Sequence, residues 1–351
     1  MRAIVKATYP RGMPDPKHGR VEVFRHESRV LAQNPLGDPA ARDVPVYLPP
    51  SYDGTRRFPV IHFLAGFTGS GPQLLNRSAW APTLPERWDR AIAEGAREAI
   101  VVLPDCFTRY GGSQYVDSPA IGAYATYVTE ELVPEIDARY RTIPARDARA
   151  IAGKSSGGFG ALWLGLRRAD VFAALASHAG DSAFELSYLR ELPTTILHLE
   201  KRGGLRAFLE WFEAQPTKSN RAIEVMSHVC CAAAWSPSAS GPYGFGSGFE
   251  WPLNPLTGAI RDDVWSRWLA FDPVRLLDEP RVLDAARSLR AIFLDAGNAD
   301  EYNLQLGARQ LAAKLSRAGI AHTHEEFDGG HMNTAYRYVR SYQVLGAAIA
   351  Q

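Results

Sequence analysis

The chain has 351 residues, of which 46% are hydrophobic and 22% charged, an ordinary composition for a globular protein. Lysine and arginine number 39 against 38 aspartate and glutamate residues, so the formal net charge of +1 gives no electrostatic footprint for nucleic acid. The length exceeds the usual size of a single core, which predicts one large domain with an insertion or two domains.

The cysteines and the N-terminus indicate a reducing compartment. Cys106, Cys230 and Cys231 are odd in number and two are adjacent, so we expect buried free thiols and neither a disulfide framework nor a zinc site. The first residues lack the apolar core of a signal peptide, and no run approaches the roughly 20 apolar residues of a membrane span. We therefore expect a cytoplasmic protein with small-molecule partners, although a chain trimmed of a leader would look the same; homo-oligomerisation stays open.

Two strands are predicted before residue 50. Residues 21–25 alternate between apolar and polar side chains, and residues 43–48 form a second extended run that Pro49 and Pro50 end. Because proline cannot donate a ladder hydrogen bond, Pro45 favours an edge position for the second strand.

From residue 58 the pattern becomes a repeat of strands and helices. Short apolar runs are typical of strands buried on both faces, and apolar residues at helical spacing separate them. The predicted strands are 58–64, 99–103, the run ending at 153, 173–178, 291–295 and 323–327; the predicted helices are 88–96, 124–140 with a kink at Pro134, the one following Ser155, 304–318 and 334–350. This alternation predicts an α/β fold with a mostly parallel sheet and helices on both faces.

The repeat is interrupted between residues 182 and 285. This stretch holds helical pieces such as 205–213 and an irregular Gly-, Pro-, Ser- and Trp-rich segment at 234–252. We interpret it as a cap or lid inserted over the carboxyl edge of the sheet, with residues 1–181 and 286–351 forming the core. Its tryptophans either line a substrate pocket, with Trp235 and Trp251 as the candidates, or pack the insertion onto the core alongside Trp265 and Trp268.

The most informative stretch is Gly153-Lys154-Ser155-Ser156-Gly157, which stands between a predicted strand and a predicted helix. A serine in a sharp strand-to-helix turn is the arrangement of a nucleophile elbow, in which flanking glycines let the two backbones pass closely. A Gly-rich corner without catalytic function is the alternative. The helix N-terminus would supply free N–H groups beside the serine.

Downstream residues supply partners for Ser155 in the order Ser, acid, His that this chemistry requires. Asp300 follows the predicted strand 291–295, and His331 follows the last predicted strand behind two glycines. We therefore predict a catalytic triad of Ser155, Asp300 and His331.

Other acids and histidines are weaker candidates. Glu301 is the second choice for the acid, Asp295 is expected to be structural, and Asp272 resembles a helix N-cap. His62 and His178 lie on predicted strands that could reach the site, but neither follows the last strand. His322 and His324 share one face of a strand, yet no third metal ligand is evident, so no metal or other cofactor is predicted.

An oxyanion hole needs two backbone donors. We expect them to be the N–H groups of Ser156, which follows the nucleophile, and of Phe67, in the Gly-rich loop after strand 58–64. Gly66 would let this loop approach the substrate closely, and we include it among the substrate-binding candidates.

Four motifs together resemble the putative-esterase family of α/β-hydrolases, which includes esterase D (S-formylglutathione hydrolase), feruloyl esterases, enterochelin esterases and the antigen 85 mycolyltransferases. The resemblance covers about residues 20–180 and 285–350 and rests on residues 63–68, 153–161, 294–302 and 327–331. It implies an α/β-hydrolase fold with the family's nucleophile, acid and base at Ser155, Asp300 and His331. Esterase D-like members usually carry His and Met where this chain has Lys154 and Ser156.

The predicted function is that of a serine carboxylic-ester hydrolase that forms an acyl-enzyme intermediate on a small-molecule ester. Three alternatives stay open: an acyltransferase with the same triad, a thioesterase similar to S-formylglutathione hydrolase, and a non-catalytic binding protein of the same fold. The sequence leaves the acyl and alcohol groups undetermined.

Overall fold

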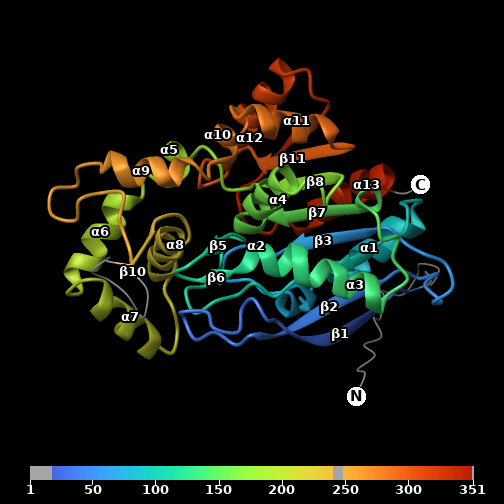
Figure 1. Ribbon diagram of the computed structural model, residues 1–351, viewed down its shortest axis with the longest axis horizontal. Coiled ribbons are helices and arrows are strands. Elements are labelled where there is room, and N and C mark those ends of the chain that lie inside the picture. Colours follow the sequence, from blue (N-terminus) through green and yellow to red (C-terminus); the bar gives the residue numbers. More distant parts are fainter. Residues whose placement is uncertain (1–17, 240–247, 350–351) are drawn as a thin grey trace.

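An eight-stranded sheet forms the centre of the computed structural model, which describes residues 18–239 and 248–349 (Figure 1). Its strand order is β1-β2-β4-β3-β7-β8-β11-β12. β1 and β4 pair antiparallel to β2, and all other neighbours pair in parallel. The strands are β1 (Arg20–Glu27), β2 (Ala41–Leu48), β3 (Val60–Leu64), β4 (Ile100–Val102), β7 (Arg149–Lys154), β8 (Ala174–His178), β11 (Ala291–Gly297) and β12 (Thr323–Phe327).

Helices cover both faces of this sheet, as predicted. On one face α1 (Leu84–Ala93) and α13 (Tyr338–Ile349) pack against alternate residues of the strands, and Trp88 stacks on Tyr342 with ring centroids 6.3 Å apart. The opposite face buries a larger apolar cluster that includes residues of α3 (Val133–Arg139), α4 (Ser156–Arg167) and α12 (Leu304–Arg317). None of the described helices is long and apolar enough to cross a membrane.

The expected edge position of Pro45 is wrong, because β2 lies between β1 and β4. Val46 pairs with Val102, the last residue of the short strand β4, so Pro45 faces the chain just beyond the end of that strand. Its carbonyl still accepts a hydrogen bond from the Leu103 N–H at 2.9 Å. The missing proline N–H therefore removes a bond at the end of the ladder, where the sheet tolerates its loss.

The helix predicted over residues 124–140 is present but divided. It consists of α2 (Tyr124–Thr126), a π-helical segment η2 (Tyr127–Leu132) and α3, with Pro134 in the first turn of α3. A proline ring clashes with the carbonyl four residues earlier, here that of Glu130, and a widened π turn relieves that contact. The irregularity expected at Pro134 thus lies in the turn before it.

The insertion is mostly helical. Most of it lies at one end of the sheet, on the left of Figure 1, and its last two helices lie beside α4 and α12. Its helices are α5 (Phe184–Ser187), α6 (Leu192–Lys201), α7 (Leu205–Ala214), α8 (Asn220–Trp235), α9 (Asp262–Leu269), α10 (Pro273–Leu276) and α11 (Pro280–Ser288). Side chains of α6, α7, α8 and α9 belong to the same apolar cluster as the sheet, so the insertion shares the core of the body. Part of the predicted irregular segment, 240–247, lies outside the described residues.

Short elements complete the described chain. They are the strand pairs β5 (Asp117–Ser118) with β6 (Gly122–Ala123) and β9 (Pro237–Ser238) with β10 (Gly248–Phe249), and the 3-10 turns η1 (Pro72–Leu75), η3 (Arg146–Ala148) and η4 (Ala335–Arg337).

Glycine allows α4 to cross closely over β3. A Cβ atom at Gly157 would lie 2.2 Å from the carbonyl oxygen of Leu64 and 2.5 Å from that of Ala65. Both obstacles are backbone atoms at the end of a central strand, which cannot rotate away as a side chain can. The position of α4, and of the residue that precedes it, therefore depends on this glycine.

We predict that Gly157→Ala lowers the free energy of unfolding by roughly 1–3 kcal/mol or prevents folding, because overpacking here must displace backbone. Urea unfolding measures the loss. Gly165→Ala on the same helix is the control, since the atoms nearest to its added Cβ belong to the side chains of Leu175 and Ile151. An equal or smaller loss for Gly157→Ala than for Gly165→Ala would contradict the prediction.

Candidate active site

Ser155 occupies a strained turn between β7 and α4. Its φ of 58° and ψ of −124° are unfavourable for a residue with a side chain. The Ser155 N–H donates to the carbonyl of His178 at 2.9 Å, and its carbonyl accepts from Phe159 at 2.8 Å. These bonds hold the serine at the carboxyl edge of the parallel strands, in the geometry of the predicted nucleophile elbow.

The structure brings Ser155, His331 and Asp300 together, although they come from three separate loops. The His331 Nε2 atom lies 3.0 Å from Ser155 Oγ, and His331 Nδ1 lies 2.8 Å from Asp300 Oδ2. Both partners of the serine are buried, with 4% of His331 and 3% of Asp300 exposed. The hydrogen-bonded series matches that of a base oriented by a carboxylate beside a hydroxyl nucleophile.

The neighbours of Asp300 fix the carboxylate and the imidazole. Asp300 Oδ1 accepts a hydrogen bond from the Tyr302 N–H at 2.9 Å, which leaves Oδ2 facing His331. Glu301, the second candidate for the acid, accepts the backbone N–H of His331 at 2.7 Å. The Tyr302 ring meets the His331 ring edge-on at 4.8 Å. The contact geometry thus favours Asp300 over Glu301 as the orienting acid.

Asp295 belongs to a different buried network. His178 Nδ1 lies 2.7 Å from Asp295 Oδ1, His178 Nε2 lies 2.8 Å from Ser341 Oγ, and Arg337 Nε donates to Asp295 Oδ2 at 2.9 Å. His178, Asp295 and Ser341 are each 1% exposed, so no substrate reaches them. The network supports the strand that carries His178, whose carbonyl holds Ser155.

The remaining sequence candidates lie elsewhere. His62 is fully buried against Phe172, and burial, helped by the Arg149 charge, lowers its pKa to about 3. Asp272 caps α10 by accepting the Val274 N–H, as its sequence context indicated. His324 lies 3.9 Å from Glu326, and within the described ranges no three His, Cys, Asp or Glu side chains converge as metal ligands.

The loop after β3 brings the predicted oxyanion donors to the elbow. A Cβ atom at Gly66 would lie 3.3 Å from the Lys154 carbonyl and 3.5 Å from Ser155 Cβ, so this loop passes directly over the serine. Thr68, with a φ of 65°, donates its N–H to the Gly111 carbonyl at 2.7 Å. The Phe67 and Ser156 N–H groups have no hydrogen-bond acceptor among residues 18–239 and 248–349.

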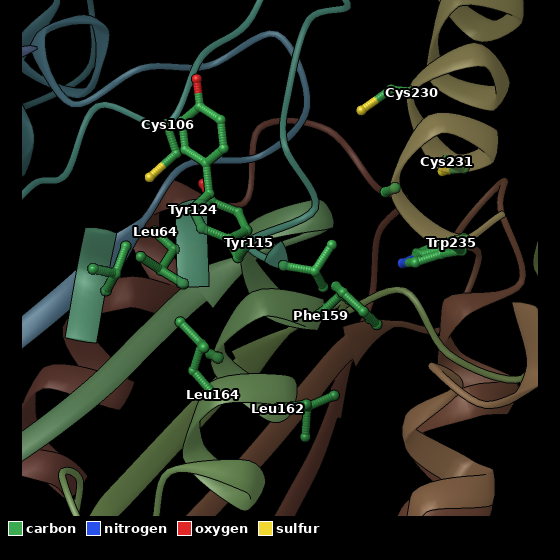
Figure 2. Close-up of a cluster of buried hydrophobic side chains, with 14 of the residues drawn as sticks. Leu64, Cys106, Tyr115, Tyr124, Phe159, Leu162, Leu164, Cys230, Cys231 and Trp235 are labelled. Carbon is green, nitrogen blue, oxygen red and sulfur yellow. The ribbon is translucent and has the colours of Figure 1, made fainter. Parts of the chain in front are cut away.

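The tryptophans proposed to line a pocket are buried. Trp235 is 1% exposed and stacks on Phe184 at 4.5 Å, and Trp251 is 4% exposed. Figure 2 shows Trp235 on the same helix as Cys230 and Cys231, at the side of the cluster where Phe159 lies. This burial favours the packing alternative for both tryptophans. The three cysteines are buried free thiols, as predicted.

Sequence reasoning missed one charged residue near the triad, Asp181, and the charges that surround Lys154. Asp181 follows β8 and accepts a hydrogen bond from the Tyr188 hydroxyl at 2.6 Å, and burial raises its pKa to about 6 against the lowering effects of that bond and of His331. Burial lowers the pKa of Lys154, while Asp300 and Asp181 oppose this shift. Asp181 follows a parallel strand just as Asp300 does, and this position in the sequence could have identified it as a candidate site residue.

We predict that Asp181→Asn stabilises the protein above about pH 6. The raised pKa means that the folded state favours the protonated carboxyl of Asp181. This carboxyl therefore contributes its full stability below the pKa that it has in the unfolded chain, about 4, and the contribution is lost as the pH rises through about 6. The amide stays neutral and still accepts from Tyr188, which gives a gain of roughly 1–3 kcal/mol at pH 7.5. Urea unfolding from pH 4 to 8 measures the difference, and a difference independent of pH would refute it.

Comparisons with known proteins agree with this fold. A ferulic acid esterase aligns with a TM-score of 0.59 at 22% identity, covering 95% of this chain and 98% of that one. An S-formylglutathione hydrolase from Agrobacterium tumefaciens aligns with a TM-score of 0.58 at 18% identity, covering 99% of each chain. At these identities the likeness shows the fold, and the predicted α/β-hydrolase fold is confirmed.

Curated relatives and a family model place the chain more narrowly. Esterase Rv1288 and Esterase MT1326, both from Mycobacterium tuberculosis, are 26% identical to it over 330 residues, which cover 89% of this chain. The match spans 56% of the length of those relatives. The model of a family described as putative esterase matches residues 39–339. The chain therefore belongs to the putative esterase family, as its motifs indicated.

Proposed function

We propose that the chain is a carboxylesterase-type serine hydrolase that acts on a small-molecule ester through an acyl-enzyme intermediate. The observation that carries the proposal is the series Ser155 Oγ, His331 Nε2 and Nδ1, and Asp300 Oδ2, joined at 3.0 Å and 2.8 Å beside a backbone turn with positive φ. Membership of the putative esterase family supports the same reaction class.

In the proposed mechanism, Ser155 Oγ attacks the ester carbonyl carbon while its proton moves to His331 Nε2. Asp300 keeps the proton on His331 Nδ1 and stabilises the imidazolium that forms. The negative charge that develops on the carbonyl oxygen meets the N–H groups of Phe67 and Ser156, at the N-terminus of α4. His331 then returns its proton to the departing alcohol, and water repeats these steps to release the acid.

A panel of substrates would identify the acyl and alcohol groups of the ester that the protein cleaves. Relatives of the same fold are named as ferulic acid esterases and S-formylglutathione hydrolases, so we include feruloyl esters and glutathione thioesters beside short acyl esters and acetylated sugars. Adding acceptor alcohols separates hydrolysis from acyl transfer. A new ester formed at the expense of free acid would identify a transferase with the same triad.

We predict that wild-type protein is labelled by a fluorophosphonate and that Ser155→Ala abolishes the label and lowers kcat on the order of 10⁵–10⁶-fold. Mass spectrometry locates the adduct, and hydrolysis of short p-nitrophenyl esters gives kcat. Wild-type protein that resists labelling and cleaves none of these esters would exclude the proposed function and favour a binding protein of the same fold.

Asp300→Asn is expected to lower kcat by about 10⁴-fold, because the amide favours the wrong imidazole tautomer while leaving the geometry intact. Glu301→Gln is the matched control. Its side-chain oxygen can still accept the His331 N–H, so kcat should change less than tenfold. If the two variants exchanged these effects, Glu301 would be the acid.

A further inference from the structure

A buried segment, residues 110–116, supports the loop that carries Phe67. The Gly111 carbonyl accepts the Thr68 N–H at 2.7 Å, and the Tyr115 hydroxyl donates to the Ala65 carbonyl at 2.5 Å. The Phe67 ring packs on Gly111 so closely that a Cβ atom there would lie 2.7 Å from the ring. Three contacts, at Ala65, Phe67 and Thr68, thus fix the loop that holds one proposed oxyanion donor.

Gln114 joins this segment to the second proposed donor. Its side chain is fully buried, its φ is 51°, and its Oε1 accepts a hydrogen bond from Ser156 Oγ at 3.1 Å. Its Nε2 donates to Cys231 Sγ on α8 at 3.2 Å. Both the oxygen and the nitrogen of this buried amide are therefore hydrogen-bonded. Because the backbone of Gln114 is in an unfavourable conformation, the surrounding contacts must hold it there.

The insertion contacts the segment 110–116 at a second residue besides Gln114. Cys230 Sγ donates to the Gly112 carbonyl at 3.2 Å. Burial raises the pKa of both Cys230 and Cys231, so the thiols stay protonated and can donate. Figure 2 shows the two cysteines on the helix beside the buried cluster that includes Tyr115 and Phe159. Helix α8 thereby reaches both sides of the proposed oxyanion hole through residues 112 and 114.

We propose that Gln114 is a positioning residue for the oxyanion hole, held by Cys231 of the insertion and holding Ser156 and the Phe67 loop in register. The inference rests on the proposed function. The donors must point at the oxygen that becomes negative in the transition state, so a shift of the segment weakens binding of the transition state far more than that of the planar ester. Loss of Gln114 therefore lowers kcat and leaves KM nearly unchanged.

The structure offers a matched control. Ser118 Oγ donates to the Ala233 carbonyl on α8 at 2.6 Å, so Ser118→Ala also removes a buried bond between the same loop and the same helix. Among residues 18–239 and 248–349, Ser118 makes no hydrogen bond to Phe67 or Ser156, so its loss tests for destabilisation alone. Cys231→Ala removes the acceptor of Gln114, whereas Cys231→Ser keeps an acceptor at that position.

The experiment measures kcat, KM and the inhibition constant of a trifluoromethyl ketone, whose serine adduct places an oxyanion in the hole. For Gln114→Ala we expect kcat to fall at least tenfold with KM within twofold, and the inhibition constant to rise by the factor lost in kcat/KM. Cys231→Ala should show a smaller effect of the same kind, and Cys231→Ser should restore it. Ser118→Ala should leave all three constants within twofold.

Equal effects of Gln114→Ala and Ser118→Ala on kcat, or a change confined to KM, would overturn the inference while the esterase activity of wild-type protein stands. If Gln114→Ala does not fold, the comparison of Cys231→Ala with Cys231→Ser tests the inference. Equal kcat values for these two variants would refute the positioning role of Gln114. Inactive wild-type protein would instead refute the proposed function.

Discussion

The left-handed backbone of Ser155 is the constraint on which the site depends. Such a conformation costs about 1–3 kcal/mol for a residue with a side chain, so surrounding contacts must hold it. They do so from three directions: the His178 carbonyl accepts the Ser155 N–H, Gly157 allows α4 to press against the end of β3, and the Phe67 loop passes over the serine. This backbone conformation directs the Ser155 hydroxyl away from the edge of the sheet and toward His331.

Burial around His331 makes the electrostatics of the site depend on few groups. Asp300 and Asp181 come from adjacent strands, β11 and β8, and Lys154 lies near both. In a medium of low polarity each charge acts strongly on its neighbours, so the protonation of Asp181 near neutral pH affects the field at the imidazole. The Tyr302 N–H donates to Asp300 Oδ1, whereas burial raises the pKa of Asp181.

The local patterns in the sequence predicted the sheet, the elbow and the geometry around Ser155, Asp300 and His331, because each depends on a short motif in a known position along the fold. Pro45 was misplaced because the length of the partner strand β4 decides whether its missing N–H matters, and no pattern near Pro45 reports that length. Gln114 was missed for a related reason, because its contact with Cys231 joins residues 117 positions apart and such pairings carry no periodicity. Asp181 follows a strand as Asp300 does, but its burial and its contact with Tyr188 depend on the tertiary structure.

The same contacts explain how an insertion can affect chemistry that its own residues do not perform. Two groups of buried hydrogen bonds link the insertion to the site. Ser156 donates to Gln114, which donates to Cys231, and the Tyr188 hydroxyl donates to Asp181. The first group includes a proposed oxyanion donor, and the second holds the carboxyl whose raised pKa is opposed by His331. Because every member is buried, the loss of one bond leaves an unsatisfied group and cannot be repaired by water. The insertion, which carries Cys231 and Tyr188, therefore contributes to the support of the site.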